Sequence, residues 1–317
     1  MSPKGIGALG LTALFQRHGQ RHRLSLLQQE AIAGYIAILP WLLGLVFFAL
    51  GPILASFILM FTHWEVLTPP RFSGLENLQR LAADPMVPIA LFNTLFYTVL
   101  AVPFHLAAAL FVALLLNVGV KGTNIYRVLA YLPSQMPVVA SSILWFFIFS
   151  PTYGLANQVL SWVGIPPQKW LWDVFLVKPS LVLMAVWALG NSMIIFLAGL
   201  QGVPEVLYEA AKIDGANVWR LFRHVTLPML SPTILFNLIV GVIGSFQIFT
   251  NVFLMTDGGP GTASLMLVLY IYRNAFVYFR MGYASVLAWL LLIIVLILTV
   301  LQFRLSRLWV FYEGEVK

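Results

Sequence analysis

Six long runs of apolar residues, nearly free of charge, limit what this chain can fold into more than any other feature of its sequence. They cover residues 31–61, 88–118, 126–149, 179–200, 232–256 and 283–303. A helix needs about 20 apolar residues to cross the roughly 30 Å of hydrocarbon in a bilayer. Each run reaches that length, so the sequence predicts an all-α integral membrane protein with six transmembrane helices.

The composition excludes a soluble domain. Of the 317 residues, 61% are hydrophobic and 9% are charged, whereas soluble domains have about 25% charged and about 45–50% apolar residues. No cysteine is present, which excludes disulfides and cysteine-based metal or redox sites. The net charge of +7 is explained by basic cytoplasmic loops, since membrane proteins concentrate Lys and Arg there. We therefore expect a lipid bilayer as the surrounding medium and no nucleic-acid partner.

The basic residues also predict the orientation, N-in and C-in. With the N-terminus inside, twelve of the 18 Lys and Arg residues fall on the inner side and six on the outer side, as the positive-inside rule requires. We expect a cytoplasmic N-terminal tail over residues 1–30, then a first transmembrane helix with its outer loop over residues 31–88. A core of five transmembrane helices follows over residues 89–305, and a cytoplasmic C-terminal tail over residues 306–317.

One polar segment, EAAKIDGANVWRLFRHVTLP, interrupts the apolar sequence between the fourth and fifth runs. We call this segment, Glu209–Pro228, the polar island. Together with the residues just before it, the pattern predicts two short cytoplasmic helices within residues 203–228, joined by a corner at Gly215. Asn217 is placed to cap the second helix, residues 218–226, which we expect to end near Pro228. Helices this short do not fold unsupported, so they need a partner protein or, alternatively, they pack on their own subunit.

The spacing within the polar island resembles the EAA motif, which marks the permease subunits of binding-protein-dependent ABC importers. The motif positions are Glu209, Ala210, Ala211, Gly215, Val225, Leu227 and Pro228. The one departure is Val225, where the motif favours Ile. Four further segments, residues 34–53, 91–99, 126–160 and 255–260, resemble the carbohydrate-uptake group of this family, which includes the maltose-type first permease and importers of sugars and glycerol phosphates. The extended outer domain of some members is missing, and the resemblance does not extend to residues 1–30.

The resemblance implies a type I ABC importer permease fold with a MetI-like core, in a bacterial or archaeal inner membrane. It implies three kinds of partner: a second permease subunit that completes a heterodimer, a dimer of cytosolic ABC ATPase subunits, and an extracytoplasmic sugar-binding protein. The chain has no Gly-x-x-x-x-Gly-Lys-[Ser/Thr] sequence, the loop that cradles ATP phosphates. We therefore expect a non-enzymatic subunit that binds no cofactor, with ATP and magnesium bound by the partner ATPase.

The same resemblance implies that the polar island couples ATP hydrolysis to movement of the spans. The expected coupling residues have four roles. The polar anchors are Glu209 and Asp214, and the small contact residues are Ala210, Ala211 and Ala216. Gly215 forms the corner, and Leu227 and Pro228 end the motif.

Polar and aromatic residues in the fourth and fifth runs are candidates for a cargo path, because sugar rings stack on aromatic side chains while their hydroxyls pair with amides. The candidates are Trp187, Gly190, Asn191, Ser192, Ser245, Phe246, Gln247, Thr250 and Asn251. If the fifth run is one helix, Gln247 and Asn251 share a face. The alternative is that these side chains hydrogen-bond between helices. The same choice, ligand contact or packed residue, applies to His105, the one clear ionisable residue within the runs.

Two other functions compete with an importer subunit. A secondary carrier predicts inverted repeats and ionisable residues within the spans, and reading the sequence reveals neither. A membrane-embedded enzyme predicts a cluster of His, Asp or Glu, whereas the histidines are scattered at His18, His22, His63, His105 and His224. The cargo stays open among sugars, oligosaccharides, polyols and glycerol phosphate.

Overall fold

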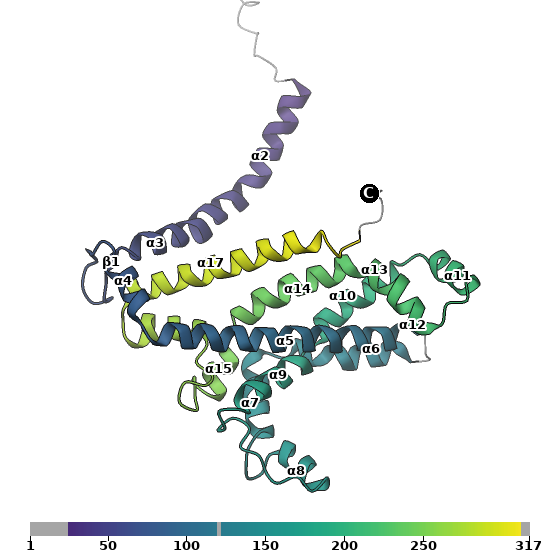
Figure 1. The fold of residues 1–317 in the computed structure, drawn as a ribbon. Helices are drawn as coiled ribbons and strands as arrows, with labels where there is room; N and C mark the ends of the chain where they lie inside the picture. The colour runs from purple at the N-terminus through teal and green to yellow at the C-terminus, as the bar shows by residue number, and fades with distance from the viewer. Residues whose placement is uncertain (1–24, 119–121, 312–317) are drawn as a thin grey trace, which may run out of the picture. The chain divides into compact units, whose positions relative to one another are not determined.

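The computed structural model describes residues 25–118 and 122–311 of the chain (Figure 1). Its secondary structure is helical, apart from one short antiparallel pairing between β1 (Thr62–His63) and β2 (Arg71–Phe72). The chain divides into two compact units, residues 1–56 and residues 57–317. The predicted tails lie mostly outside the described residues, because only residues 25–30 of the first and 306–311 of the second are described.

The first unit contains α2 (Leu26–Gly44), the π-helical segment η1 (Leu45–Leu50) and most of α3 (Gly51–Leu59). The helix begins at Leu26, ahead of the apolar run, because Ser25 and Gln28 form a capping box: the Ser25 hydroxyl accepts from the Gln28 amide at 3.3 Å, and the Gln28 side chain accepts from the Ser25 amide at 2.9 Å. None of the residues of α2 is buried. A helix that is apolar on every side and unburied needs lipid or another protein around it.

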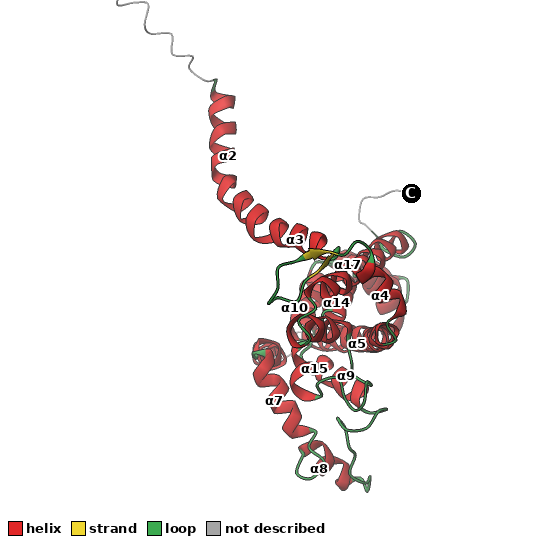
Figure 2. Ribbon diagram, turned by 90° about the vertical axis from the view of Figure 1, so that its left-hand side faces the viewer, coloured by secondary structure: helices red, strands yellow, loops and turns green. Residues whose placement is uncertain are grey.

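The second unit is a helical bundle built around α5 (Met86–Asn117), which packs against α9 (Val177–Trp187), α10 (Gly190–Gln201) and α14 (Ser231–Phe246). The final long helix, α17 (Met281–Ser306), packs on α14. Figure 2 looks along these helices and shows α5, α14 and α17 nearly end-on. Nine shorter elements complete the described part of this unit, beside the segments of the third run given below. They are α4 (Glu76–Ala83), α8 (Leu155–Trp162), α11 (Glu205–Ile213), α12 (Val218–Leu221), η3 (Phe222–Thr226), α13 (Leu227–Met229), α15 (Thr250–Met255), α16 (Leu267–Tyr272) and η4 (Arg273–Val277).

Several predicted spans are broken. The third run forms α6 (Thr123–Tyr131), η2 (Leu132–Gln135) and α7 (Val138–Ile148), which meet at 95° because Pro133 and Pro137 cannot continue a helix. The fourth forms α9 and α10, bent by 48°. Three described helices are long enough to cross a membrane alone, and up to six crossings result if each bent pair counts as one.

The prediction that residues 232–256 form one unbroken helix is wrong. The α14 helix ends at Phe246, and α15 starts at Thr250. The last turn of α14 tightens: the amides of Gln247 and Ile248 donate to the carbonyls of Gly244 and Ser245, three residues back, at 3.2 and 3.4 Å. Such a turn is a frequent helix terminus, and it leaves an irregular stretch, residues 247–249, next to the core.

At the end of the bundle where α5 and α17 begin, Asp84 joins three helices. Its Oδ2 accepts hydrogen bonds from the hydroxyls of Tyr270 and Tyr283, both at 2.5 Å, and Arg80 stacks over the Tyr283 ring at 4.7 Å. Burial raises the pKa of Asp84, but the two phenols, the Met86 amide and the nearby Arg80 together hold that pKa below its ordinary value. The carboxylate therefore stays charged and fastens the link after α4 to α16 and α17.

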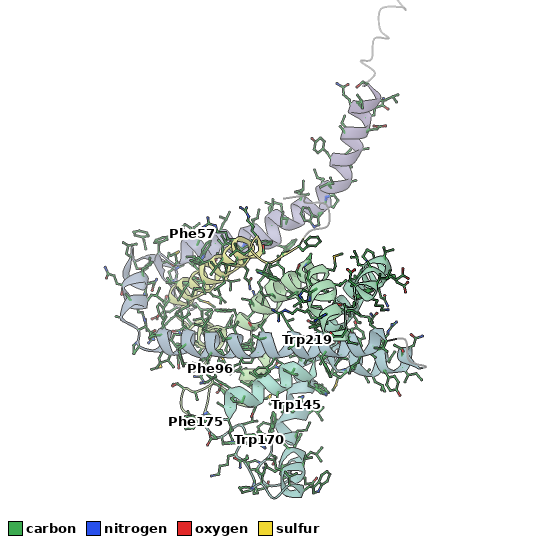
Figure 3. All side chains as sticks on the ribbon, turned by 45° about the vertical axis from the view of Figure 1, so that its right-hand side comes forward. Phe57, Phe96, Trp145, Trp170, Phe175 and Trp219 are labelled. Carbon is green, nitrogen blue, oxygen red and sulfur yellow. The ribbon has the colours of Figure 1, made fainter. Side chains whose placement is uncertain are left out.

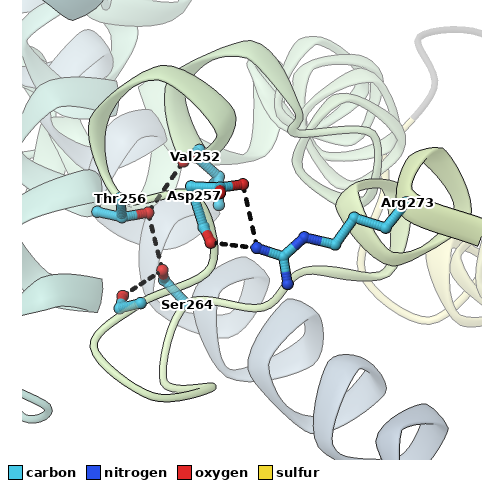
Figure 4. Close-up of polar contacts among 6 residues, drawn as sticks. Val252, Thr256, Asp257, Ser264 and Arg273 are labelled. Atoms are coloured by element: carbon cyan, nitrogen blue, oxygen red, sulfur yellow. Dashed lines mark hydrogen bonds and ion pairs between the residues drawn. The ribbon is translucent and has the colours of Figure 1, made fainter. Parts of the chain in front are cut away.

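The loop between α15 and α16 is also fixed at this end. Asn93 donates to the carbonyls of Thr262 at 2.7 Å and Leu265 at 3.2 Å, and the Lys178 ammonium donates to Asn93 Oδ1 at 3.1 Å and Ala263 O at 3.0 Å. From η4, Arg273 pairs with Asp257 of the loop at 3.1 Å (Figure 4). The backbone of this non-helical loop is thus held by side chains from α5, α9 and η4.

Candidate transport path and coupling corner

A cavity of about 390 Å³ lies where the fourth and fifth spans are broken. Residues from α5, α7, α9, α14 and α15 line it: Tyr97, Ala101, Val102, His105, Leu106, Val138, Ala185, Ala188, Gly241, Gly244, Ser245, Gln247, Ile248, Phe249, Thr250 and Asn251. Irregular backbone at membrane depth is tolerated where it lines a cavity or is buried in protein. The breaks after α9 and α14 meet that condition here.

Four of the predicted path residues line this cavity: Ser245, Gln247, Thr250 and Asn251. The geometric reason given for Gln247 and Asn251 is wrong, because Gln247 follows the end of α14 and Asn251 belongs to α15. They converge on one cavity through a chain break instead of through one helical face. Within the described part of the chain, the Gln247 and Thr250 side chains make no hydrogen bond, so their polar groups are available to water or to a ligand.

The other candidates lie outside this lining. Phe246 is 2% exposed in the core, Trp187 packs edge-on against Trp145 at 5.7 Å, and Asn191 accepts a hydrogen bond from Gln135 at 3.5 Å. Trp145 and Trp170, on the α7–α8 side of the bundle in Figure 3, belong to the same aromatic cluster through Phe149, whose ring lies 5.0 and 5.4 Å from theirs. Trp187 therefore contributes to packing.

Gly190 is a packing position. It is buried at the start of α10, and a Cβ there would lie 2.7 Å from Ser134 Oγ and 2.8 Å from the Tyr131 Cα. The absence of a side chain lets α10 approach the end of α6.

His105 lies near the middle of α5 and makes two hydrogen bonds. Its Nδ1 contacts Ala185 O at 2.8 Å, and its Nε2 contacts Ser192 Oγ at 3.1 Å. Since a carbonyl oxygen only accepts, Nδ1 carries a proton, and in the neutral ring Nε2 accepts from the Ser192 hydroxyl. His105 is therefore bonded to neighbouring helices, as one of the two alternatives predicts, and its ring also forms part of the cavity wall.

The polar island forms the predicted helix–corner–helix. The end of α11 is a Schellman motif: the Gly215 amide donates to Lys212 O at 3.0 Å and the Ala216 amide to Ala211 O at 2.9 Å. Gly215 has φ of +79°, which glycine adopts without steric cost. Asn217 caps α12 by accepting from the Arg220 amide at 2.9 Å, which confirms the predicted cap.

The second island helix ends near Pro228, as the sequence predicts. It runs through η3 and α13 to Met229, and the chain then bends by 64° into α14. Pro228 lies in the first turn of α13, and η3 before it is π-helical, with the Leu227 amide bonding to Phe222 O five residues back. This wider turn accommodates a residue that has no amide hydrogen. The island is consequently continuous with a spanning helix.

The island is held together by a side-chain hydrogen bond but leaves apolar side chains exposed. The Tyr208 hydroxyl bonds to Thr226 Oγ1 at 3.0 Å, joining α11 to η3. Four exposed apolar side chains of the island, which we call the island patch, are Val206, Ile213, Val218 and Trp219, exposed by 70%, 87%, 83% and 64%. Val218 and Trp219 also line a cavity together with Tyr208 and Thr226. Trp219 is labelled in Figure 3.

Among the predicted coupling residues, Glu209, Ala210, Asp214, Gly215 and Leu227 are exposed, and Ala211, Ala216 and Pro228 are partly buried. The sequence reasoning missed the island patch and Lys178. For α11, the spacing of Val206, Ala210 and Ile213 along one helical face was a usable signal.

A bundle of broken apolar helices around a cavity with several polar side chains in its wall, with a capped helical corner at one end, is typical of a multi-pass membrane transport protein. Residues 90–309 match the model of the binding-protein-dependent transport system inner membrane component. The chain belongs to this family and is a permease subunit of a binding-protein-dependent ABC importer.

Two curated relatives and one solved structure illustrate the likeness. The chain is 41% identical to the probable ABC transporter permease protein YesP of Bacillus subtilis (strain 168), over 91% of this chain and 95% of YesP. It is 36% identical to the lactose transport system permease protein LacF of Rhizobium radiobacter, over 90% and 97% of the two chains. Its fold matches a chain in the crystal structure of a bacterial alginate ABC transporter bound to an alginate pentasaccharide-bound periplasmic protein. That match has a TM-score of 0.78 and 22% identity, and covers 88% of this chain and 95% of the other.

Proposed function

We propose that this permease imports a carbohydrate, a sugar or oligosaccharide, across a bacterial or archaeal inner membrane, forming half of the translocation path. The lactose relative, at 36% identity over nearly the whole chain, supports the cargo class. The polar groups in the cavity also suit this cargo, since Gln247 and Thr250 offer amide and hydroxyl groups beside the aromatic rings of Tyr97 and Phe249.

The observation that carries the proposal is the island patch. Exposed aliphatic and aromatic side chains on a rigid corner suit burial against a protein, where each contributes about 1.5–3 kcal/mol. We assign this face to a cytosolic ATPase subunit that binds ATP and magnesium, because the chain itself has no P-loop sequence. In this arrangement both termini and the island are cytoplasmic, a second permease completes the path, and a sugar-binding protein delivers cargo from outside.

Purification of the intact complex tests the assignment. A tagged chain, extracted in mild detergent from cells that express its gene neighbourhood, should bring down an ATPase and a second permease. In proteoliposomes that contain this complex and the binding protein, sugar should accumulate only when ATP is present on the side of the membrane where the ATPase lies. Sugar uptake by the purified chain alone, without an ATPase, would contradict the assignment of the island patch to an ATPase.

Alanine at Gln247 or Asn251 is expected to weaken cargo handling. Losing one hydrogen bond to cargo costs about 1 kcal/mol, which corresponds to a roughly fivefold higher apparent KM for uptake. The measurement is uptake kinetics in proteoliposomes with saturating binding protein. Asn191→Ala is the matched control, because this amide lies outside the cavity lining. If KM and maximal rate are unchanged in both cavity variants, these two side chains belong to packing.

A further inference from the structure

His105 connects both sides of the break in the fourth span. Ala185 belongs to the last turn of α9, and Ser192 to the first turn of α10. One ring nitrogen bonds to each of them, at 2.8 and 3.1 Å. The last four carbonyls of a helix have no partner within that helix, so the ring satisfies a group that the break releases.

The same ring lies in the wall of the cavity. His105, Ala185 and Ala188 all line it, so the part of the span that His105 holds is also the part that shapes the cavity. Both ring nitrogens are already engaged by the protein, and neutral imidazole has only one donor and one acceptor. His105 therefore has no hydrogen bond left to offer a ligand.

We propose that His105 is a positioning residue: it sets the bend between α9 and α10 from α5 and thereby fixes the width of the translocation cavity. The effect on cargo rests on the proposed function, whereas the effect on the bend does not. Removing the His105 ring releases both bonds, to Ala185 O and to Ser192 Oγ, whereas removing the Ser192 hydroxyl releases only the second.

The bend can be measured directly, because the chain has no cysteine of its own. Cysteines introduced at Leu183 and Ala198, exposed positions on α9 and α10, carry spin labels for distance measurements in the complete transporter. We expect one narrow distance distribution in the otherwise unchanged protein. His105→Ala should broaden or shift it, and Ser192→Ala should do so to a smaller extent.

His105→Asn is the conservative variant, since its amide can still donate toward Ala185 O. It should restore part of the narrow distribution. Uptake kinetics are the second measurement. In His105→Ala, the fold increase in the apparent KM should be several times larger than the fold decrease in the maximal rate per folded complex. His105→Asn should show a smaller increase in the apparent KM. A combined His105→Ala and Ser192→Ala variant should add little to the first.

An unchanged distance distribution in His105→Ala and in Ser192→Ala overturns the inference. A changed distance distribution with unchanged uptake kinetics supports the positioning role of His105, but it contradicts the assignment of the cavity as the cargo path. If His105→Ala does not assemble, the milder Ser192→Ala variant decides the question by the same two measurements.

Discussion

Gly215→Pro is expected to abolish ATP-driven uptake while the protein still inserts and assembles in the membrane. Gly215 has φ of +79°, and a proline ring fixes φ at about −65°, so the corner between α11 and α12 cannot form. The substitution also removes the amide that donates to Lys212 O. Because the island is continuous with α14, a displaced corner no longer transmits movement. A loss of about 1.4 kcal/mol of coupling suffices for a tenfold fall in uptake.

Gly164→Pro is the matched control. Gly164 follows α8 with φ of +76°, and it closes the same Schellman motif, with its amide on Ser161 O at 3.1 Å and the Ile165 amide on Leu160 O at 3.0 Å. A Cβ has open space at both glycines. The measurement is the ratio of sugar imported to ATP hydrolysed in proteoliposomes. We expect this ratio to collapse in Gly215→Pro and to hold in Gly164→Pro; a normal ratio in both would contradict the coupling role.

The island was predictable because its signals are local. A glycine that ends one helix and an asparagine that caps the next act within four residues, through backbone hydrogen bonds that the sequence alone implies. The end of the second helix was also predictable, because Pro228 marks it and the helix ends one residue later, at Met229. The π-helical turn at Phe222–Thr226 was not, since nothing in the sequence distinguishes it from an ordinary helical turn.

The cavity was only partly predictable because it depends on where spans break. Hydropathy shows that residues 179–200 and 232–256 are apolar, but it does not show that α9 ends at Trp187 or α14 at Phe246. Those ends are fixed by partners far along the chain, such as His105 for α9. The sequence therefore pointed to segments that line the cavity, and Gln247 and Asn251 do line it, although not through the shared helical face that was predicted. It could not separate Gly190 from that lining.

The breaks also explain why buried and partly buried polar residues in this bundle contact backbone groups. Asn93 and Lys178 bond to carbonyls of the loop between α15 and α16, and His105 bonds to a carbonyl of α9. Each interrupted helix releases backbone groups that lipid cannot satisfy. A polar residue within an apolar run is thus evidence of a nearby interruption as much as of a ligand.

Gly190→Val is expected to prevent correct folding of the bundle. Gly190 is buried, and even the first carbon of a side chain would lie 2.8 Å from the Tyr131 Cα and 3.0 Å from its carbonyl oxygen. These are backbone atoms, which cannot swing aside, so α6 and α10 must separate. Overpacking of this kind costs about 1–3 kcal/mol or more. The measurement is the yield of monodisperse protein and its melting temperature in detergent, for Gly190→Ala and Gly190→Val.

Gly244 provides the matched comparison, because it also lies in a spanning helix but has nothing within 4 Å of an added Cβ. An alanine in a helix interior normally stabilises by about 0.5–1 kcal/mol relative to glycine, so Gly244→Ala should keep or raise the melting temperature. Gly190→Ala should lower it, because the close contact outweighs the propensity gain. Since Gly244 lines the cavity and Gly190 does not, Gly244→Ala should instead alter the apparent KM for uptake. If Gly190→Val is stable and its cargo affinity is altered, Gly190 contacts cargo and is not only a packing position.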